Sequence, residues 1–464
     1  MTTASLLHAK LNNNHLVSKK HFGIRQLFLL CLPLMATELS SALMIFLDRV
    51  FLAQYDTQAM VAATTAANIF FIFQIGSVSI AMVGEVFVGQ YNGAKQYKQL
   101  GSPVWQMIWF SLLFGCVMIP IGIWGGQYIF TTSIAEHAIP YFTWIMIFGP
   151  LFPLCASLST FYLGRGDFKT LFIAFFIGNL ANVPLSYLFI FGIEGIVQGH
   201  GTQGAAISTG VANIIIFSIL LKDFIKPAYR KMYGTHQWMF SKVLFQKSIK
   251  IGLPNALGHL SATTAWALNL IFLSKLSFEH VTLASIALSI WMLSYFVTDC
   301  LQKSTTAVAA NYIGANHREK LPEILKAGLK IFAIFMIILA IPLMVLPKLW
   351  ISLFLPENTQ NSVNLINLVQ SSLLWLWIAI FFDGMVWVVD GILTAIGDTK
   401  FIFYMNAIGT WIFFLLPVYL FVYVNEGAPI LTIQISTIFC CALFICYYLR
   451  FLYNERHKRV YIQL

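Results

Sequence analysis

Eight ionisable side chains fall inside long apolar stretches of this sequence. Six are acids and two are bases, and together they are Glu38, Asp48, Glu85, Asp299, Asp383, Asp390, Arg49 and Lys303. Inserting such a group into a bilayer costs at least about 2.5 to 3.5 kcal/mol, so those present usually face protein or water and serve a purpose. An excess of carboxylates is suited to holding a proton, a metal cation or a cationic organic compound.

The composition places these side chains in a membrane protein. Of the 464 residues, 59% are apolar and only 10% are charged, and the mean hydropathy is +0.78. A soluble domain carries about 25% charged residues. The sequence therefore indicates one polytopic membrane domain and excludes a disordered, collagen-like or disulfide-rich chain. The seven cysteines all lie in apolar stretches without zinc or redox spacing, so we interpret them as packing residues.

The apolar stretches have the length of membrane-spanning helices. About 20 apolar residues cross a hydrocarbon core, and no ten-residue alternating segments typical of a membrane β-barrel are seen. The sequence predicts twelve spanning helices, near residues 27–52, 61–88, 104–125, 138–162, 170–192, 203–222, 247–274, 282–310, 324–347, 364–396, 401–424 and 428–450.

The positions of Lys and Arg predict the orientation. Of 28 such residues, 24 lie at the two ends of the chain or in the even-numbered connections. Loops retained in the cytoplasm accumulate these residues, so we expect both termini to be cytoplasmic. The net charge of +10 then reflects topology and anionic lipid rather than a nucleic-acid partner. No cleavable signal is evident in the first 26 residues.

The chain looks like two copies of a six-helix unit. Matched landmarks, in the same order in each half, are Leu32-Pro33 with Leu253-Pro254, Gln90–Ala94 with Asn311–Ala315, and Gly166–Lys169 with Gly397–Lys400. Because each unit crosses the membrane an even number of times, the copies are related by an axis along the membrane normal. Rocking of such halves around a central site gives alternating access.

The repeat defines the expected domains and fold class. We predict a polar N-terminus at 1–26, an N-terminal lobe at 27–230, a linker at 231–246, a C-terminal lobe at 247–453 and a basic tail at 454–464. The fold class is an all-α integral membrane protein with twelve transmembrane helices. These form two pseudo-symmetric six-helix bundles that enclose a central cleft.

Over essentially its whole length the chain resembles the multidrug and toxic compound extrusion (MATE) family. The resemblance rests on Pro33 with Asp48, the turn Gly89–Ala94, the run Gly164–Asp167 followed by Asn182 and Gly204–Ala206, and Asp383 before Gly397–Thr399. It implies a secondary efflux transporter in a bacterial inner membrane that exchanges amphipathic, cationic organic compounds for protons or sodium ions. We expect a small organic substrate, no cofactor beyond the coupling ion, no enzymatic activity, and a monomer in the bilayer.

Asp48 is the first candidate for ion coupling. Asn182 and Thr209 could supply neutral oxygens beside it, and the resemblance implies that these positions couple protons or sodium. The competing interpretation pairs Asp48 with the adjacent Arg49. Ser186 stands where some family members carry an aspartate, which disfavours a complete sodium site, so no metal site is assigned beyond Asp48, Asn182 and Thr209.

The second half offers Asp383 as a further coupling candidate. Asp390 lies seven residues later on the same helix face, while the glutamate that usually accompanies this acid in the family is missing near Ala262. Asp299 and Lys303 are spaced i, i+4 and can pair. The pair is either a neutralising structural bridge or a substrate or relay site.

Glu85 and Glu38 complete the set of cavity candidates, with Asp299, Lys303 and Asp390. We interpret Glu85 as a packing or gating acid near the cytoplasm, whereas Glu38 is compatible with either a structural or a functional role.

Two other functions are compatible with a polytopic fold. A lipid-linked oligosaccharide flippase would need an interior rich in Arg and Lys, which the excess of acids disfavours. An integral membrane lipid transferase would need an acid-rich metal motif or paired histidines on a loop, and the sequence has neither. It also lacks a phosphate-binding loop, a His-Glu-x-x-His motif and a Gly-x-Ser-x-Gly elbow.

Overall fold

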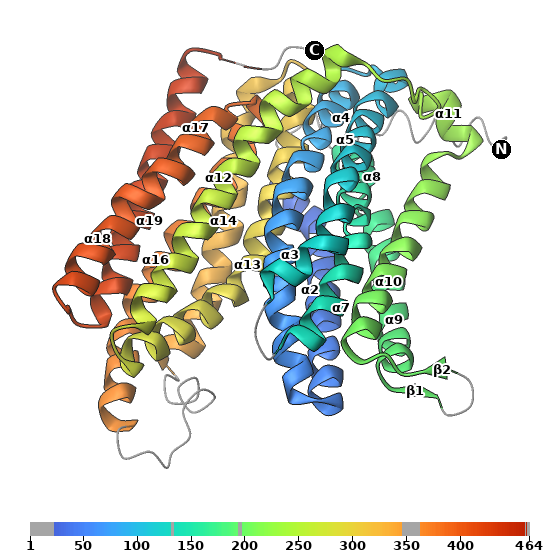
Figure 1. The fold of residues 1–464 in the computed structure, drawn as a ribbon. Helices are drawn as coiled ribbons and strands as arrows, with labels where there is room; N and C mark the ends of the chain where they lie inside the picture. The colour runs from blue at the N-terminus through green and yellow to red at the C-terminus, as the bar shows by residue number, and fades with distance from the viewer. Residues whose placement is uncertain (1–22, 131–133, 194–196, 346–361, 460, 462–464) are drawn as a thin grey trace.

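The computed structural model describes residues 23–130, 134–193, 197–345, 362–459 and 461, and it is built almost entirely of helices (Figure 1). Most of the predicted polar N-terminus, the end of the basic tail and residues 346–347 of the ninth predicted span lie outside the described residues. The first half, which we call the N-lobe, contains α2 (Ile24–Tyr55), α3 (Thr57–Met82), α4 (Gly84–Gly93), η1 (Tyr97–Gln99), α5 (Gly101–Pro120), η2 (Ile121–Gly125), α6 (Gly126–Ile129), α7 (Ala135–Ile147), α8 (Leu151–Arg165), α9 (Phe168–Phe191), β1 (Gly192–Ile193), β2 (Val197–Gln198) and α10 (Gly201–Phe224).

A short helix, α11 (Pro227–Tyr233), lies between the two halves. The second half, the C-lobe, contains α12 (Lys242–Ser274), α13 (Phe278–Gly314), η3 (Arg318–Lys320), α14 (Leu321–Ala340), η4 (Ile341–Val345), α16 (Ser362–Ile396), α17 (Thr399–Tyr404), η5 (Met405–Gly409), η6 (Trp411–Leu415), α18 (Leu416–Val418), η7 (Tyr419–Val424) and α19 (Ile430–Arg456). Strands β1 and β2 form a small antiparallel hairpin that pairs Gly192 with Gln198.

The twelve predicted spans are confirmed. Within the described residues eleven helices are long and apolar enough to cross a membrane, and the bent pair Phe278–Met292 and Ser294–Gly314 makes twelve. This pair, which forms α13, bends by 42°. One boundary differs, since α12 begins at Lys242 rather than near residue 247. The Ser241 Oγ accepts a hydrogen bond from the Leu244 backbone N–H at 3.4 Å, and this cap starts the helix earlier.

The internal repeat is visible in the backbone of two equivalent turns. After α4, Lys95 has a φ of 59°, and after α13 Asn316 has a φ of 60°. The next residue in each turn, Gln96 or His317, donates its backbone N–H to a carbonyl five residues earlier at 2.9 Å. A single turn of 3-10 helix follows in both halves, η1 and η3. Such agreement confirms that the two halves are pseudo-symmetric bundles.

Large apolar side chains cover the outside of these bundles. Phe46, Phe421 and Ile438 are 62%, 57% and 67% exposed. A helix that is apolar on nearly every face is suited to protein on one side and lipid on the other. Helix α2 belongs to both interiors, because Leu27 packs in the hydrophobic core of the C-lobe and Leu34 in that of the N-lobe. The start of α2 therefore crosses from one lobe to the other.

The two lobes meet at one end of the molecule, which we call the basic end because the Lys-rich and Arg-rich connections lie there. The ribbons of the two lobes converge at this end, at the top of Figure 1, and diverge toward the β1–β2 hairpin. Part of this contact is made by three side-chain amides that we call the amide seal, namely Gln90, Asn92 and Asn311. All three are buried.

The hydrogen bonds of the amide seal are reciprocal. The Gln90 Nε2 of the N-lobe donates to the Ala395 carbonyl at 3.2 Å, and the Asn311 Nδ2 of the C-lobe donates to the Gly164 carbonyl at 2.7 Å. Gln90 corresponds to Asn311 in the repeat, and Gly164 corresponds to Ala395. The Asn92 Nδ2 also donates to the Asn311 Oδ1 at 2.7 Å. Each lobe thus repeats the same contact on the other.

Two glycines bring the backbones of α4 and α13 together at the seal. A Cβ atom at Gly93 would lie 1.9 Å from the Asn311 carbonyl oxygen, and one at Gly314 would lie 2.0 Å from the Gln90 carbonyl oxygen. Only a residue without a side chain allows this approach. The closed basic end therefore depends on these two positions.

The segment between the lobes is fastened to the N-lobe. The Trp105 and Trp109 indole N–H groups of α5 donate to the carbonyls of Thr235 and Trp238 at 2.8 and 2.9 Å. The Ser241 backbone N–H donates to the Gln106 Oε1 of the same helix at 2.9 Å. The segment before α12 is therefore bonded to α5 up to the residue that caps α12, Ser241.

Replacing Gly93 by Ala is expected to destabilise this closed end. The added methyl group meets backbone rather than a flexible side chain, so we expect a strain of about 3 kcal/mol, the upper end of the usual range, which outweighs the gain in helix propensity of about 1 kcal/mol. Thermal unfolding of the purified protein in detergent would measure the loss. The matched control is Gly409→Ala, where nothing lies within 4 Å of the added Cβ. Equal melting temperatures for the two variants would contradict the close contact.

Candidate functional site

Asp48 lies in the C-terminal half of α2, and its carboxylate is held by hydroxyl groups from α9 and α10. The Ser186 Oγ donates to the Asp48 Oδ1 at 2.5 Å, and the Thr209 Oγ1 lies 3.4 Å from the Asp48 Oδ2. The Asp48 side chain is only partly buried, whereas Ser186 is fully buried. The carboxylate therefore sits at the edge of a polar interior.

The hydroxyls form a chain that can run in either direction. The Ser186 Oγ is 2.7 Å from the Ser208 Oγ, which is 2.8 Å from the Ala205 carbonyl. Each hydroxyl has one proton to donate. When Asp48 is ionised, Ser208 donates to Ser186 and Ser186 to the carboxylate. When Asp48 carries a proton, the chain can reverse and end at the Ala205 carbonyl, so every donor keeps an acceptor in both states.

Asn182 contacts Asp48 only through this chain. Its Oδ1 lies 3.2 Å from the Ser186 Oγ, and its buried Nδ2 has no hydrogen-bond partner within the described residues. Among the described residues, no ion pair joins Asp48 to Arg49, so the structure does not support that competing interpretation. Ser186, which the sequence marked only by its missing carboxylate, is the closest partner of Asp48.

Asp383 lies on α16 beside tryptophans of the C-lobe. The Trp291 Nε1–H donates to the Asp383 Oδ2 at 3.2 Å. Trp266 packs edge-on against Trp291 with ring centroids 5.4 Å apart. Asp383 is partly exposed. A carboxylate bordered by indole rings can attract an organic cation by charge and by the negative faces of the rings.

A second aromatic group continues from this acid toward the other lobe. Trp387, one turn after Asp383 on α16, stacks on His259 with centroids 5.5 Å apart and meets the Tyr295 ring edge-on at 5.8 Å. Tyr295 is 48% exposed. The C-lobe thus places two aromatic groups near Asp383, one formed by Trp266 and Trp291 and one by Trp387 and Tyr295.

Asp390 faces the same neighbouring helix as Asp383 but is enclosed. The Gln302 Nε2 of α13 donates to the Asp390 Oδ1 at 2.7 Å, and the Thr394 Oγ1 donates to the same oxygen at 3.2 Å. Asp390 is 3% exposed. Its hydrogen bonds connect α16 to α13, and the carboxylate offers little surface to a ligand.

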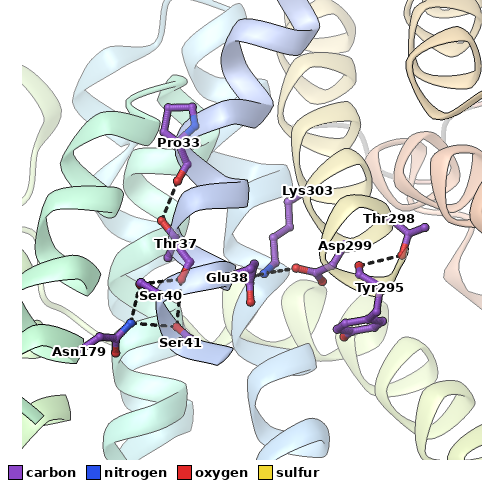
Figure 2. Close-up of polar contacts among 10 residues, drawn as sticks. All are labelled: Pro33, Thr37, Glu38, Ser40, Ser41, Asn179, Tyr295, Thr298, Asp299 and Lys303. Atoms are coloured by element: carbon purple, nitrogen blue, oxygen red, sulfur yellow. Dashed lines mark hydrogen bonds and ion pairs between the residues drawn. The ribbon is translucent and has the colours of Figure 1, made fainter. Parts of the chain in front are cut away.

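Lys303 lies between the two lobes and carries the densest group of charges. Its Nζ is 2.6 Å from the Asp299 Oδ2 on the same helix and 2.9 Å from the Glu38 Oε1 on α2 (Figure 2). The i, i+4 pair expected from the sequence therefore forms, and Glu38 joins it from the other lobe. We call Glu38, Asp299, Lys303 and Glu85 the interlobe cluster.

Glu85 adds a third carboxylate to this cluster from the first turn of α4. It is 3% exposed, and its Oε1 has no hydrogen-bond partner within the described residues. The charges of Lys303 and Asp299 both act on it. The interlobe cluster therefore holds one ammonium group and three carboxyl groups.

The predicted residues form three separate groups rather than one site. Asp48, Asn182 and Thr209 meet in the N-lobe, Asp383 and Asp390 face α13 in the C-lobe, and the interlobe cluster lies between them. The described residues hold no group of three or more His, Cys, Asp or Glu side chains placed to bind a metal ion. A sodium ion would have to be held by Asp48 together with hydroxyl and amide oxygens.

Comparison with known proteins agrees with the division of the chain into two similar lobes. A family model described as MatE matches residues 33–188 and again residues 254–420, one match in each lobe. The chain is 25% identical over 398 residues to a protein named "Probable multidrug resistance protein NorM" from Mannheimia succiniciproducens, a match that covers 84% of each chain.

The fold is also similar to those of solved transporters. One is described as the outward-facing conformation of a multidrug resistance MATE family transporter of the MOP superfamily, with a TM-score of 0.79, 17% identity and coverage of 94% of this chain and 96% of that one. Another is a MOP superfamily transporter from Pyrococcus furiosus, described by a reverse polarity of its binding pocket that suggests a different function. It has a TM-score of 0.77, 17% identity and coverage of 93% and 96%. Because the family model matches well over half of the sequence, the chain belongs to the MATE family of membrane transporters.

Proposed function

We propose that this protein is a secondary efflux transporter that exchanges amphipathic organic cations for protons, or for sodium ions, by alternating access. The observation that carries the proposal is the partly exposed Asp48 carboxylate at the end of a buried hydroxyl chain. An acid that gains its ion in one conformation and loses it in the other links ion entry to substrate exit.

The hydroxyl chain favours a proton as the coupling ion. Ser186 and Ser208 can reverse their donor directions when Asp48 changes its protonation state, so neither state leaves a buried donor without an acceptor. Sodium would need several oxygens turned toward it at once, and Ser186 supplies one oxygen where an aspartate would supply two. Sodium coupling is the alternative, and the transport experiment below distinguishes it from proton coupling.

The C-lobe carries the proposed substrate contacts. Asp383 offers a negative charge, and Trp291, Trp266 and Trp387 offer aromatic faces near it. A flat or bulky organic cation would gain from both the charge and the rings. Asp390, which is enclosed by Gln302 and Thr394, takes a structural role in this proposal.

The orientation follows from the distribution of basic residues. With the Lys-rich and Arg-rich connections in the cytoplasm, the basic end is the cytoplasmic end. The amide seal then closes the protein on the inside, and the described conformation corresponds to the outward-open half of the cycle. Opening to the cytoplasm would require the bonds of Gln90 and Asn311 across the lobes to break.

A lipid-linked oligosaccharide flippase of the same broad superfamily is the second candidate. Binding a pyrophosphate would require unpaired cations in the interior. Lys303 is already paired with Asp299 and Glu38, and acids outnumber bases among the intramembrane groups. The charge balance therefore favours a cationic substrate. A lipid transferase is disfavoured by membership of a transporter family.

The setting of this function is part of the proposal. We place the protein in a bacterial inner membrane as a monomer with both termini in the cytoplasm. We propose that two parts of the protein move against each other. These are the N-terminal lobe at 27–230 and the C-terminal lobe at 247–453, which the linker at 231–246 joins.

Transport in proteoliposomes with separately imposed proton and sodium gradients tests the function. We expect efflux of an organic cation such as ethidium to follow the proton gradient, and Asp48→Asn to reduce this driven efflux to background, because the amide cannot exchange a proton. Asp383→Asn is expected to weaken substrate affinity about tenfold or more while the remaining flux still follows the proton gradient. Flux that ignores both gradients would refute the antiporter proposal, and flux that follows sodium alone would refute proton coupling.

Ser186→Ala tests the hydroxyl chain separately from the acid. The variant keeps Asp48 but removes its closest donor, so we expect proton-driven efflux to fall about tenfold without a loss of ethidium affinity. Ser40→Ala is the matched control, because Ser40 bonds Asn179 of α9 and not Asp48. Wild-type efflux by Ser186→Ala would show that the chain has no part in coupling.

A cysteine at Gln237, an exposed residue near Gly234, tests the orientation. This residue lies in the segment fastened to α5 at the basic end. A membrane-impermeant thiol reagent should label it only in inside-out vesicles. Labelling from outside intact cells would show that the topology is the reverse of the proposed one. The same reagent on the unmodified protein gives the background from native cysteines.

A further inference from the structure

The interlobe cluster has one cation for three carboxylates, and that cation is part of the protein. Lys303 bridges Asp299 in its own lobe and Glu38 in the other. The third carboxylate, Glu85, is more than nine-tenths buried and has an oxygen without a hydrogen-bond partner in the described part of the chain.

The part of α2 that carries Glu38 is bonded to the N-lobe, as Figure 2 shows. On a neighbouring face of α2, Ser40 and Ser41 both accept hydrogen bonds from the Asn179 Nδ2 of α9, at 2.8 and 3.0 Å. The Thr37 Oγ1 donates to the Pro33 carbonyl at 2.9 Å, which supports the helix one turn after its proline. These bonds fix α2 to the N-lobe, so the contact of Glu38 with Lys303 joins one lobe to the other.

The cluster lies beyond the amide seal, toward the middle of the membrane. Lys303 is eleven residues before the end of α13, which places it about 16 Å from that end at about 1.5 Å per residue. Glu38 is fourteen residues after the start of α2 at the same end, about 21 Å along the helix. A ligand that enters from the diverging side of the lobes would meet this cluster before it met the seal.

The charged side chains of the cluster are partly accessible. The side chains of Lys303 and Glu38 are 26% and 31% exposed, and that of Asp299 is 12% exposed, while Glu85 is enclosed. The exposed ring of Tyr295 lies one turn before Asp299 on α13. The cluster therefore combines negative charge with an aromatic surface, the two features that an amphipathic cation requires.

We propose that Glu38, Asp299 and Glu85 form a cation-binding site between the lobes, in which the Lys303 ammonium is a tethered occupant that an organic cation displaces from Glu38. The tether keeps the carboxylates compensated while no substrate is present. Arrival of a substrate cation moves the Lys303 ammonium to Asp299, its partner within the same helix. The bond between Glu38 and Lys303 that joins the lobes is lost in the same step, so binding loosens the lobes against each other.

The class of ligand in this inference rests on the proposed function, but its test does not require transport. The experiment is equilibrium binding of radiolabelled tetraphenylphosphonium, a permanent cation without a titratable proton, to the purified protein in detergent at one fixed pH. Lys303→Met removes the competing charge at similar length, and we expect its affinity to be at least about tenfold higher than that of the wild type. Lys303→Arg keeps the charge and should bind like the wild type.

The double variant Lys303→Met with Glu38→Gln identifies the carboxylate. We expect it to lose most of the affinity gained by Lys303→Met, because Glu38 is the acid that the ligand takes over. Affinity of Lys303→Met equal to or below that of the wild type would overturn the inference, as would a double variant that keeps the full gain. Absence of tetraphenylphosphonium binding to every variant would overturn it too.

A reversible chemical modification at position 303 provides a second test in case the Lys303→Met protein does not fold. Lys303→Cys treated with aminoethyl methanethiosulfonate regains an ammonium group and should bind the probe weakly, whereas the neutral hydroxyethyl reagent should leave binding strong. Reduction with dithiothreitol should restore tight binding after the aminoethyl reagent and leave it unchanged after the hydroxyethyl reagent, and the wild type treated in the same way corrects for native cysteines. Equal binding after the two reagents would contradict the tethered-cation site. If the inference fails while proton-driven efflux persists, the proposed function stands without it.

Discussion

A charged side chain inside a bilayer must be compensated by a partner, and this requirement shapes the interior of the protein. Lys303 meets it by sharing its ammonium between Asp299 and Glu38. Asp48 meets it with hydroxyl donors, and Asp383 with an indole N–H. These partners differ in what they allow. A hydroxyl chain can follow a proton, an indole beside a partly exposed acid leaves space for a ligand, and a shared ammonium can change partners. Helices from both lobes supply these partners, since Glu38 of α2 meets Lys303 of α13 and Ser186 of α9 meets Asp48 of α2.

The internal repeat supplies symmetry to the framework but not to the chemistry. The amide seal uses equivalent residues from both lobes, and the turns after α4 and α13 match in dihedral angle and hydrogen bonding. The charged positions do not match. In the register of the repeat Asp48 corresponds to Asn269, which is buried, and Ser186 corresponds to Pro417. One lobe thus carries an acid held by hydroxyl groups and the other an acid beside indole rings, while the amide seal joins the lobes at the basic end.

The sequence predicted most of the fold, because membrane spans and repeats depend on local patterns. Apolar length located the twelve helices, and matched Gly, Asn and Asp landmarks located the equivalent turns. The i, i+4 spacing of Asp299 and Lys303 predicted their pairing for the same reason. The sequence could not predict that Glu38 contacts Lys303, since that contact spans the two lobes and depends on how α2 packs against α13.

The sequence predicted the Asp48 site only in part, because the closest contact of Asp48 also depends on how the helices pack. Asn182 and Thr209 were assigned to it by resemblance, yet Ser186 is the side chain that touches Asp48 most closely. Its position one helical turn after Asn182 was visible in the sequence, but only packing of α9 against α2 shows that a hydroxyl there reaches the carboxylate. The boundary of α12 moved for a local reason that the sequence did contain, the capping Ser241.

The central claim is that the lobes touch at the basic end in one state and separate there in another. The most direct measurement is the distance between spin labels at Gln96 and Asn316, two exposed residues in equivalent turns of opposite lobes, in nanodiscs with and without substrate and at different pH values. The account predicts a short, narrow distance for the closed seal and a second, longer population when the protein opens toward the cytoplasm. A single unchanged distance under every condition, in protein that transports, would contradict it.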